Sequence, residues 1–397
     1  MTPPATVEGA GFRRLKVLTI LGTRPEIIRL SLIIRALDEH TEHTLVHTGQ
    51  NYDERLDAIF FHELGVRAPD INLGIRGFGF GDQVGKLLTA IEPILVERRP
   101  DRLLILGDTN SGLAAICARR LGIPVYHMEA GNRCFDDRVP EEVNRRIIDH
   151  SSTVLLPYTE RSRDNLLAEG FHRSRVIVTG NPIKEIIDRH WARITASRAL
   201  EDLGVTAGGY ILVTAHRAEN VDVLHRLLSI VDAVSTIGET YGLPVLCSLH
   251  PRTRERVQAA GIDLAARGIR ALEPLGFFDF VQLERQARCV LSDSGTVQEE
   301  TCIFGVPNVT IRDVTERPET IECGSNYVAG TGRDDIVRAV DFVMARQSVW
   351  TPPPEYVRTD VADTVLRVLL AERIADTAEL EWRTGARLGL PSPRATV

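Results

Sequence analysis

Two acidic residues stand where predicted strands end. Asp108 directly follows the apolar run at residues 103–107, and Glu129 directly follows a second run at residues 124–128. Residues 111–121 between them have helical composition, so the stretch predicts a β–α–β unit with parallel strands. In an open α/β sheet, ligands bind beyond the carboxyl ends of the strands. We therefore expect both carboxylates at a ligand-binding edge.

A third acidic group follows closely in the sequence. Neighbouring strands are about 5 Å apart, so Asp108 and Glu129 would lie side by side if their strands pair. Glu141 and Glu142 come directly after Pro140, at the predicted start of the next helix. Compensation of the helix dipole is the alternative role for these two glutamates. Three carboxylates at one edge are suited to acid–base catalysis.

The sequence GTRPE at residues 22–26 predicts a phosphate site. It links a predicted strand at residues 16–21 to a predicted helix at about residues 25–37. A helix N-terminus offers free N–H groups to an anion, and Arg24 would add a bidentate donor. A simple surface-turn role for Arg24 is equally compatible with these residues.

A second candidate phosphate site is at Ser294, Gly295 and Thr296, between a predicted strand and a predicted helix. Thr296 and Glu299 also have the spacing of a capping box, which would satisfy the same backbone donors. Both interpretations hold if Ser294 and Gly295 face the ligand. Glu300 would then accept hydrogen bonds from ribose hydroxyls.

His216 and His250 each follow a predicted strand, at residues 210–215 and 243–249. Two histidines at corresponding strand ends favour a place near the ligand over a purely structural role. They lack the spacing and the carboxylate partner of a zinc site, so we expect no catalytic metal.

The composition narrows the class of protein. The chain has 397 residues, enough for two domains, with 43% hydrophobic residues and a net charge of −7. No dense basic run predicts a nucleic-acid partner. The six cysteines form no CxxC pair, and no stretch is typical of a signal peptide or a membrane span. We expect a cytoplasmic protein with reduced thiols and no membrane partner.

Strands and helices alternate in two cycles, which predicts an α/β fold with two Rossmann-like, doubly wound domains. We place a loose tail at residues 1–14, an N-terminal domain at 15–182, a C-terminal domain at 183–354, and a helical segment with a tail at 355–397. The glycine-rich residues 74–86 do not fit a Walker A motif, so we expect a loop there and a helix only from residue 87.

Seven motifs together resemble one family. They are GTRPE (22–26), GDTNS (107–111), HMEAGNR (127–133), PEEVNR (140–145), AHRAEN (215–220), DSGTVQEE (293–300) and RDVTERPE (312–319). In this order and spacing they are similar to the non-hydrolysing UDP-N-acetylglucosamine 2-epimerases, over roughly residues 16–370. The resemblance implies a glycosyltransferase-B-like fold, a site in the interdomain cleft, a homodimer, a UDP-N-acetylhexosamine substrate and no cofactor.

The resemblance also implies a reaction and roles for residues. UDP is eliminated to leave a 2-acetamidoglucal and is then added back with the configuration at carbon 2 inverted. The implied catalytic residues are Asp108, Glu129, Glu141 and His216. The implied substrate and UDP contacts are Arg24, Arg29, Arg145, His250, Phe280, Ser294, Gly295, Thr296 and Glu300, with Phe280 near the uracil and Glu300 at the ribose.

Several residues depart from the family pattern. Arg29 stands where most members have lysine, and Thr296 replaces a glycine. Asn51 and Asp53 replace residues that help to hold a second, activating UDP-N-acetylglucosamine, so we expect weak or absent activation. Residues 131–140 are two shorter than in the commonest members. The stretches HTGQNYD (47–53), NRCFDDRVPEE (132–142) and SGT (294–296) are similar to the branch that converts UDP-2-acetamido-2,6-dideoxy-L-talose to UDP-N-acetyl-L-fucosamine. The talose derivative therefore stays an alternative substrate.

Two other functions stay open at this point. A UDP-sugar glycosyltransferase on the same fold would need an acceptor site and no proton-transfer groups. A nucleotide-sugar-binding protein without turnover would not need the three carboxylates.

Overall fold

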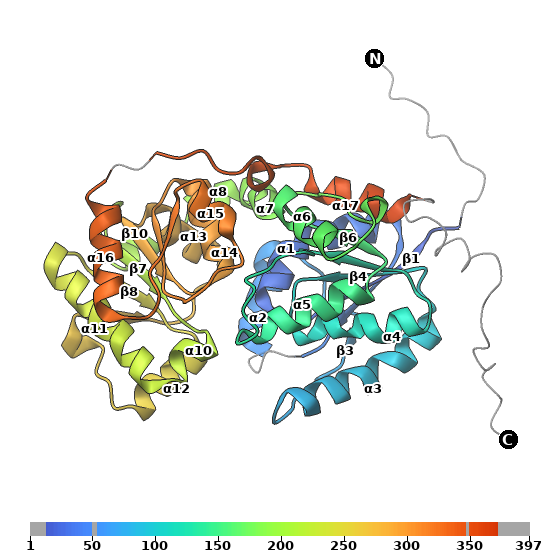
Figure 1. The fold of residues 1–397 in the computed structure, drawn as a ribbon, viewed down its shortest axis with the longest axis horizontal. Coiled ribbons are helices and arrows are strands. Elements are labelled where there is room, and N and C mark those ends of the chain that lie inside the picture. Colours follow the sequence, from blue (N-terminus) through green and yellow to red (C-terminus); the bar gives the residue numbers. More distant parts are fainter. Residues whose placement is uncertain (1–12, 50–53, 347–348, 372–397) are drawn as a thin grey trace, which may run out of the picture.

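The computed structural model describes residues 13–49, 54–346 and 349–371. Within them the chain forms two six-stranded sheets, each with helices on both faces (Figure 1). The strand orders are β3-β2-β1-β4-β5-β6 and β12-β11-β10-β7-β8-β9, and neighbouring strands are parallel. The predicted pair of doubly wound α/β units is confirmed.

The first sheet is formed by six strands, and nine α-helices occur in the described part of the chain before the second sheet begins. Its strands are β1 (Lys16–Leu21), β2 (Glu42–His47), β3 (Ile71–Asn72), β4 (Arg102–Leu106), β5 (Val125–Met128) and β6 (Val154–Leu156). The helices up to the second sheet are α1 (Arg24–His40), α2 (Glu54–Leu64), α3 (Phe80–Arg98), α4 (Ala115–Arg120), α5 (Pro140–Ser151), α6 (Glu160–Ala168), α7 (Ile183–Arg189), α8 (Trp191–Thr195) and α9 (Ala199–Asp202).

Both faces of the N-terminal sheet are apolar, as expected for a sheet covered on both sides. Successive residues of β1 point to opposite faces. Val17 and Leu21 pack in the core formed with α1, whereas Leu18 and Ile20 pack in the core formed with α3 and α4. The continuous apolar runs of the sequence therefore correspond to strands buried on both faces.

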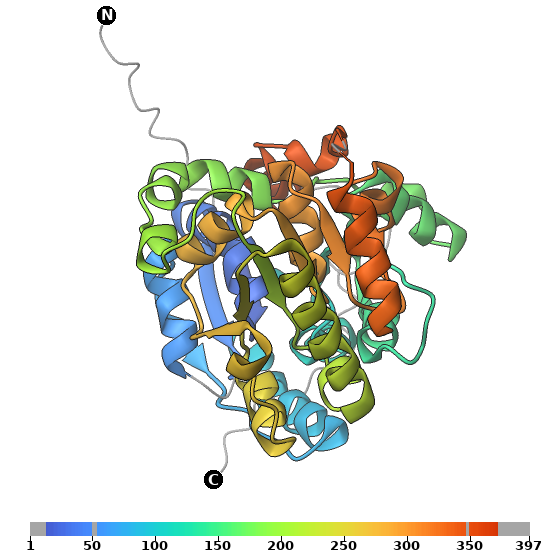
Figure 2. The ribbon, with the colours of Figure 1, turned by 90° about the vertical axis from the view of Figure 1, so that its left-hand side faces the viewer.

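The C-terminal half repeats this arrangement. Its strands are β7 (Ile211–Thr214), β8 (Val245–Ser248), β9 (Ile269–Leu272), β10 (Cys289–Ser292), β11 (Asn308–Thr310) and β12 (Asn326–Val328). Its helices are α10 (Ala218–Val221), α11 (Leu224–Tyr241), α12 (Pro251–Ala259), α13 (Phe277–Gln286), α14 (Gly295–Phe304), α15 (Pro318–Glu322) and α16 (Arg333–Met344), and α17 (Val361–Leu370) follows. Figure 2 shows α11 and α16 side by side over one face of this sheet.

The chain returns to the N-terminal half at its end. Helix α17 packs against α1, and its residues Val361, Val365 and Leu369 belong to the same core as Leu30 of α1 (Figure 1). Helix α7 contributes Ile186 and its neighbours to this core as well. The domain boundaries stay a proposal, in which we now count α7 and α17 with the N-terminal half because their apolar faces are buried there.

One predicted loop is partly helical. We expected residues 74–86 to form a loop, but α3 begins at Phe80 and therefore includes Gly81 and Gly85. Glycine lowers helix propensity by about 1 kcal/mol per residue. The helix forms because Leu87, Ile91 and Leu95 bury their side chains against the sheet. No helix of the described residues is long and apolar enough to cross a membrane.

Candidate active site

The predicted strand-end carboxylates are neighbours. β4 pairs with β5 in parallel register, with Leu106 opposite Met128, so Asp108 and Glu129 follow these strands at the same edge of the sheet. Glu129 has a positive φ of 64°, which a non-glycine residue rarely adopts. Such a backbone conformation persists only where the surroundings hold it, and it is common at functional sites.

Asp108 is held by a buried arginine. Its Oδ2 accepts hydrogen bonds from Nη2 of Arg145 at 2.5 Å and from Nε at 3.2 Å. Arg145 lies one turn into α5 and also donates to Glu142 at 2.6 Å. Its side chain is fully buried, so these carboxylates are the partners that offset the cost of burying the charge. The sequence predicted Arg145 as a ligand contact, and the structure places it beside Asp108.

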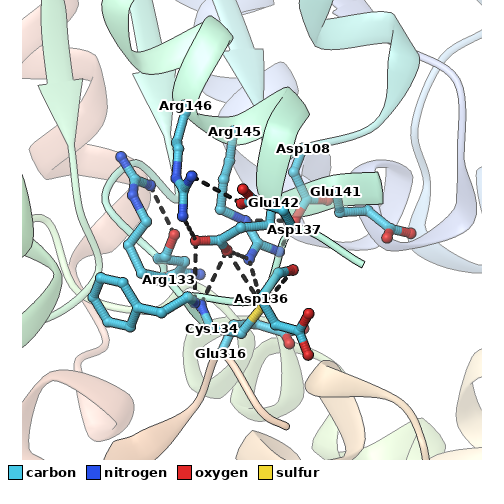
Figure 3. A network of polar contacts seen from close by, with 12 residues as sticks. Asp108, Arg133, Cys134, Asp136, Asp137, Glu141, Glu142, Arg145, Arg146 and Glu316 are labelled. Atoms are coloured by element: carbon cyan, nitrogen blue, oxygen red, sulfur yellow. Dashed lines mark hydrogen bonds and ion pairs between the residues drawn. The ribbon is translucent and has the colours of Figure 1, made fainter. Parts of the chain in front are cut away.

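Glu141 and Glu142 point in different directions, although they are adjacent in the sequence (Figure 3). Glu142 is fully buried and accepts hydrogen bonds from the backbone N–H groups of Cys134 and Phe135, and from Arg145 and Arg146. These donors lower the pKa of Glu142 although burial opposes the shift. Glu142 therefore fixes the segment that follows Glu129, and it is not free for catalysis.

Glu141 points toward the C-terminal half. Its Oε1 accepts a hydrogen bond from Nη1 of Arg217 at 2.7 Å, and the carboxylate stays about 31% exposed. Arg217 also lies 3.6 Å from Glu316. Glu316 is buried between several arginines, with Arg312 at 3.0 Å, and these charges hold its pKa well below the usual range.

Glu129 is the second link between the halves. Its Oε1 accepts a hydrogen bond from Nη2 of Arg317 at 2.5 Å. Arg317 is the N-cap residue of α15 and also donates to Glu299 of α14, which in turn pairs with Arg29 of α1. Asn132 donates to Glu129 at 3.2 Å. A continuous chain of buried charges thus joins the two halves beside the strand-end carboxylates.

The segment between Glu129 and α5 is anchored at its start by Asp149. This fully buried carboxylate accepts hydrogen bonds from the backbone N–H of Gly131 at 3.2 Å and from Arg133 at 2.7 Å, and its other oxygen lies 2.8 Å from Nδ1 of His127. A side chain at Gly131 would collide with the backbone of α6, and its φ is 79°. The glycine is therefore required where this segment passes close to the helix.

The two predicted histidines are neighbours in the C-terminal half. The rings of His216 and His250 lie 5.7 Å apart, and Nδ1 of His216 is 3.3 Å from Oδ1 of Asp293. Desolvation lowers the pKa of both rings, that of His250 to about 4, and the charge of Arg24 adds to this effect. Arg24, at the start of α1, thus acts electrostatically on both histidine rings.

The glycine turn before α1 has an internal partner for its donors. The backbone N–H groups of Gly22 and Thr23 donate to the carboxylate of Glu26 at 2.6 and 2.7 Å. Thr109 donates to the other oxygen of Glu26 at 2.6 Å. Burial raises the pKa of Glu26 to about 7. The two N–H groups that we expected to bind an anion are therefore already used, and Arg24 stays the candidate phosphate contact on this turn.

Arg29 has a different environment from the one expected for a ligand contact. It is about 1% exposed, and its guanidinium donates to Glu299 and to Asn181, the latter at 3.1 Å. Its charge lies over the ring of Tyr158. Arg29 thus holds α1 to α14 and is closed to solvent.

The start of α14 differs from the predicted capping box. Ser294 is the N-cap residue, and its Oγ lies 3.0 Å from Oγ1 of Thr296. Glu299 forms ion pairs with two arginines and does not cap the helix, so the capping-box interpretation of Thr296 and Glu299 is wrong. A Cβ atom at Gly295 would lie 2.8 Å from a carboxylate oxygen of Glu316. The carboxylate of Glu316 therefore packs directly against the backbone at the start of α14.

Glu300 and Phe280 belong to the same region of the C-terminal half. Glu300 is about 6% exposed and lies near the fully buried carboxyl group of Glu284. Burial raises the pKa of Glu300 to about 7. Phe280 is half-buried on α13 and packs against the core beneath α14. The nucleoside contacts that the resemblance implied for these two residues stay a prediction.

Two important arginines were missed by the sequence analysis. Arg217 and Arg317 lie in motifs that we used for the resemblance, but neither was predicted as a site residue. A signal was available for Arg317, because the sequence Arg-Pro-Glu occurs both at residues 24–26 and at residues 317–319, each time at a helix start. Arg217 directly follows His216 after a strand, at the edge where ligands bind.

Two further expectations concern metal binding and activation. Among the described residues, no group of three or more histidine, cysteine, aspartate or glutamate side chains could hold a metal ion. Asn51 and Asp53, on which the expected absence of activation depends, lie outside the described residues.

The fold and the site together define a class of protein. Two Rossmann-like units, joined by ion pairs between carboxylates of one half and arginines of the other, form a glycosyltransferase-B-like fold. The family model described as UDP-N-acetylglucosamine 2-epimerase matches residues 35–370. The chain belongs to this family, and it is an enzyme of the isomerase class.

Individual relatives are similar over most of the chain. The UDP-N-acetylglucosamine 2-epimerase of Methanocaldococcus jannaschii is 41% identical over 85% of this chain and 95% of its own length. The crystal structure of the M. jannaschii enzyme with UDP-GlcNAc and UDP superposes with a TM-score of 0.84 at 39% identity, covering 89% of this chain and 99% of that one. The UDP-2,3-diacetamido-2,3-dideoxy-D-glucuronate 2-epimerase of Pseudomonas aeruginosa is 40% identical over 82% of this chain and 91% of its own length.

Proposed function

We propose that the enzyme interconverts UDP-N-acetylglucosamine and UDP-N-acetylmannosamine. One observation supports this most strongly: Asp108, Glu129 and Glu141 lie at one strand edge, each hydrogen-bonded to an arginine. The arginine partners of Glu129 and Glu141 come from the other half of the chain. A site of this kind combines groups that transfer protons with cations that can stabilise a leaving diphosphate.

The chemistry explains the need for several carboxylates. The proton on carbon 2 of the sugar is not acidic, so direct removal is slow. Cleavage of the anomeric C–O bond releases UDP, and loss of the carbon 2 proton then gives a 2-acetamidoglucal. Addition of UDP with protonation on the opposite face gives the epimer. Acid–base groups are needed on both faces, and negative charge near carbon 1 stabilises an oxocarbenium-like transition state.

We assign the roles from these positions. Asp108, Glu129 and Glu141 are the acid–base and charge-stabilising groups. His216, whose pKa is lowered by desolvation, is a neutral donor at pH 7 for the diphosphate or the sugar. We further assign Arg24, His250, Ser294, Gly295 and Thr296 to the diphosphate, and Phe280 and Glu300 to the uridine. The fixed arginine partners mean that little reorganisation is needed during the reaction.

Incubation in D2O tests this assignment directly. The purified enzyme is mixed with UDP-N-acetylglucosamine without an acceptor, and the products are followed by NMR. Deuterium at carbon 2 together with the manno epimer is the expected result. UDP release that requires an added acceptor would instead show a glycosyltransferase, and binding without exchange would show a protein without turnover. Either result would contradict the proposal.

The sugar specificity has a second candidate. The P. aeruginosa relative, at almost the same identity as the M. jannaschii relative, is named for a sugar that differs at carbons 3 and 6. The resemblance of HTGQNYD, NRCFDDRVPEE and SGT to another branch of the family adds UDP-2-acetamido-2,6-dideoxy-L-talose as a third candidate. The same D2O assay on these three substrates ranks them by kcat/KM, and we expect UDP-N-acetylglucosamine to rank first.

We also propose a homodimer that works in the cytoplasm. The six cysteines are free in the structure, which agrees with a reducing compartment. Light scattering on the purified protein would give about twice the chain mass, and a monomer at micromolar concentration would contradict the proposal.

A further inference from the structure

A pair of thiols lies next to the charge network that joins the two halves. Sγ of Cys302 and Sγ of Cys323 are 3.6 Å apart, close enough for a thiol–thiol contact. Cys302 is buried on α14, and Cys323 is half-buried at the C-cap of α15. The other cysteines among the described residues have no such partner.

We propose that Cys302 and Cys323 are an oxidation site, at which a reversible disulfide joins α14 to α15 and lowers turnover. The sulfur atoms need to approach by roughly 1.5 Å to reach the S–S distance of about 2.05 Å. The two helices already pack against each other, so no large movement of the chain is required.

The pair has the features of a reactive dithiol. Cys323 is accessible, and the hydrogen bond from Cys302 lowers its pKa to about 6. The same contact and burial raise the pKa of Cys302, which keeps its proton. Oγ of Ser325 is a second neighbour of Cys323, at 3.4 Å from its Sγ. A half-exposed thiolate beside a buried thiol is the arrangement in which one sulfur attacks and the other resolves.

The oxidation step is balanced with a small disulfide as the oxidant. The Cys323 thiolate attacks oxidised glutathione, and one glutathione leaves as a thiolate. Cys302 then loses its proton and displaces the second glutathione to form the protein disulfide. The two protein thiols lose two electrons and two protons in total, and the oxidant is reduced to two glutathione molecules.

The location explains why this disulfide would lower turnover. Glu299 and Glu300 lie on α14, three and two residues before Cys302, and Arg317 is the N-cap residue of α15. Arg317 connects Glu299 to Glu129. Because protein interiors are tightly packed, drawing the helices together moves Arg317 relative to Glu129. A displacement of about 1 Å near a catalytic group can cost up to a hundredfold in rate.

The test uses the folded full-length enzyme with oxidised glutathione. Free thiols are alkylated afterwards, and peptide mapping identifies a Cys302–Cys323 disulfide by the loss of two hydrogen atoms. We expect kcat/KM for epimerisation to fall at least tenfold and to recover with dithiothreitol. Both thiols remaining open to alkylation would overturn the proposal, and so would a disulfide that forms without a change in kcat/KM.

Variants separate this site from other oxidation. Cys323→Ser removes the half-exposed partner and should keep full activity in oxidised glutathione. Cys117→Ser, on α4 in the N-terminal half, is the matched control. In oxidised glutathione it should lose activity to the same extent as the wild type. Equal inactivation of Cys323→Ser and wild type would also overturn the proposal. Each variant is compared with its own reduced form, whose epimerase activity is measured first. A negative result for the disulfide therefore does not affect the proposed epimerase function.

Discussion

Arg317 and Glu129 form an ion pair across the two halves of the chain, with Nη2 2.5 Å from Oε1. Their side chains are about 5% and 10% exposed, so the pair is largely desolvated. Breaking such a pair leaves an uncompensated buried charge, which is costly. The pair therefore fixes how the second sheet sits over the carboxylates of the first.

Replacement of Arg317 tests this role. Arg317→Met removes the donor shared by Glu129 and Glu299, so we expect a loss of about 3 kcal/mol in the free energy of unfolding. We also expect kcat/KM to fall at least tenfold, because Glu129 loses the group that orients it. Thermal unfolding and steady-state kinetics measure both effects.

A surface arginine provides the control for this experiment. Arg35 pairs with Glu39 while both side chains are about 60% exposed, so Arg35→Met should change neither measurement appreciably. Wild-type stability and kinetics in Arg317→Met would show that the ion pair with Glu129 is unimportant.

Asp108→Asn and Glu141→Gln test the acid–base assignment. Each change keeps the size of the side chain but removes its ability to transfer a proton, so we expect a loss of about 10²- to 10⁴-fold in carbon 2 exchange. UDP affinity, measured by calorimetry, should change much less. Nearly normal deuterium exchange in both variants would rule out the mechanism.

Adjacent glutamates allow a matched comparison of catalysis and stability. Glu142→Gln removes the charge that Arg145 and Arg146 share, so we expect the free energy of unfolding to fall by about 3 kcal/mol. Glu141→Gln should leave it within about 0.5 kcal/mol of wild type, because this carboxylate is partly exposed. Denaturant unfolding of both variants at pH 7 measures the difference. The reverse order of stabilities would contradict the division of roles seen in the structure.

The raised pKa of Glu26 predicts how the stability of the protein depends on pH. Burial raises its pKa from the ordinary glutamate value of 4.5 to about 7 in the folded protein. The protonated form is thus favoured by folding, and the stability that it contributes is present below pH 4.5 and is lost as the pH rises through 7. Glu26→Gln has no proton to lose, so its stability relative to wild type should rise between about pH 5 and 8 by up to roughly 3 kcal/mol.

The pH series needs only denaturant unfolding of the two proteins side by side. Subtracting the free energy of unfolding of one protein from that of the other cancels the contributions of the titrating groups that both proteins share. A difference that stays constant from about pH 5 to 8 would show that Glu26 titrates normally in the folded state.

The sequence by itself determined the alternation of strands and helices, because buried parallel strands are continuous apolar runs and helices have apolar residues at helical spacing. It also determined that Asp108 and Glu129 lie together, since a β–α–β unit brings the ends of its strands to one edge. Both inferences rest on residues close in the chain, where local geometry limits the choices.

Only the tertiary structure decided which partners these carboxylates have. Glu129 and Arg317 are 188 positions apart, and Glu141 and Arg217 are 76 apart, so no local pattern connects them. Glu299 had the spacing of a helix cap, but its carboxylate forms ion pairs with two buried arginines. Leaving those arginines unpaired in the interior would cost more free energy than leaving the helix without this cap. The packing of one sheet over the other sets these pairs, and with them the chemistry of the site.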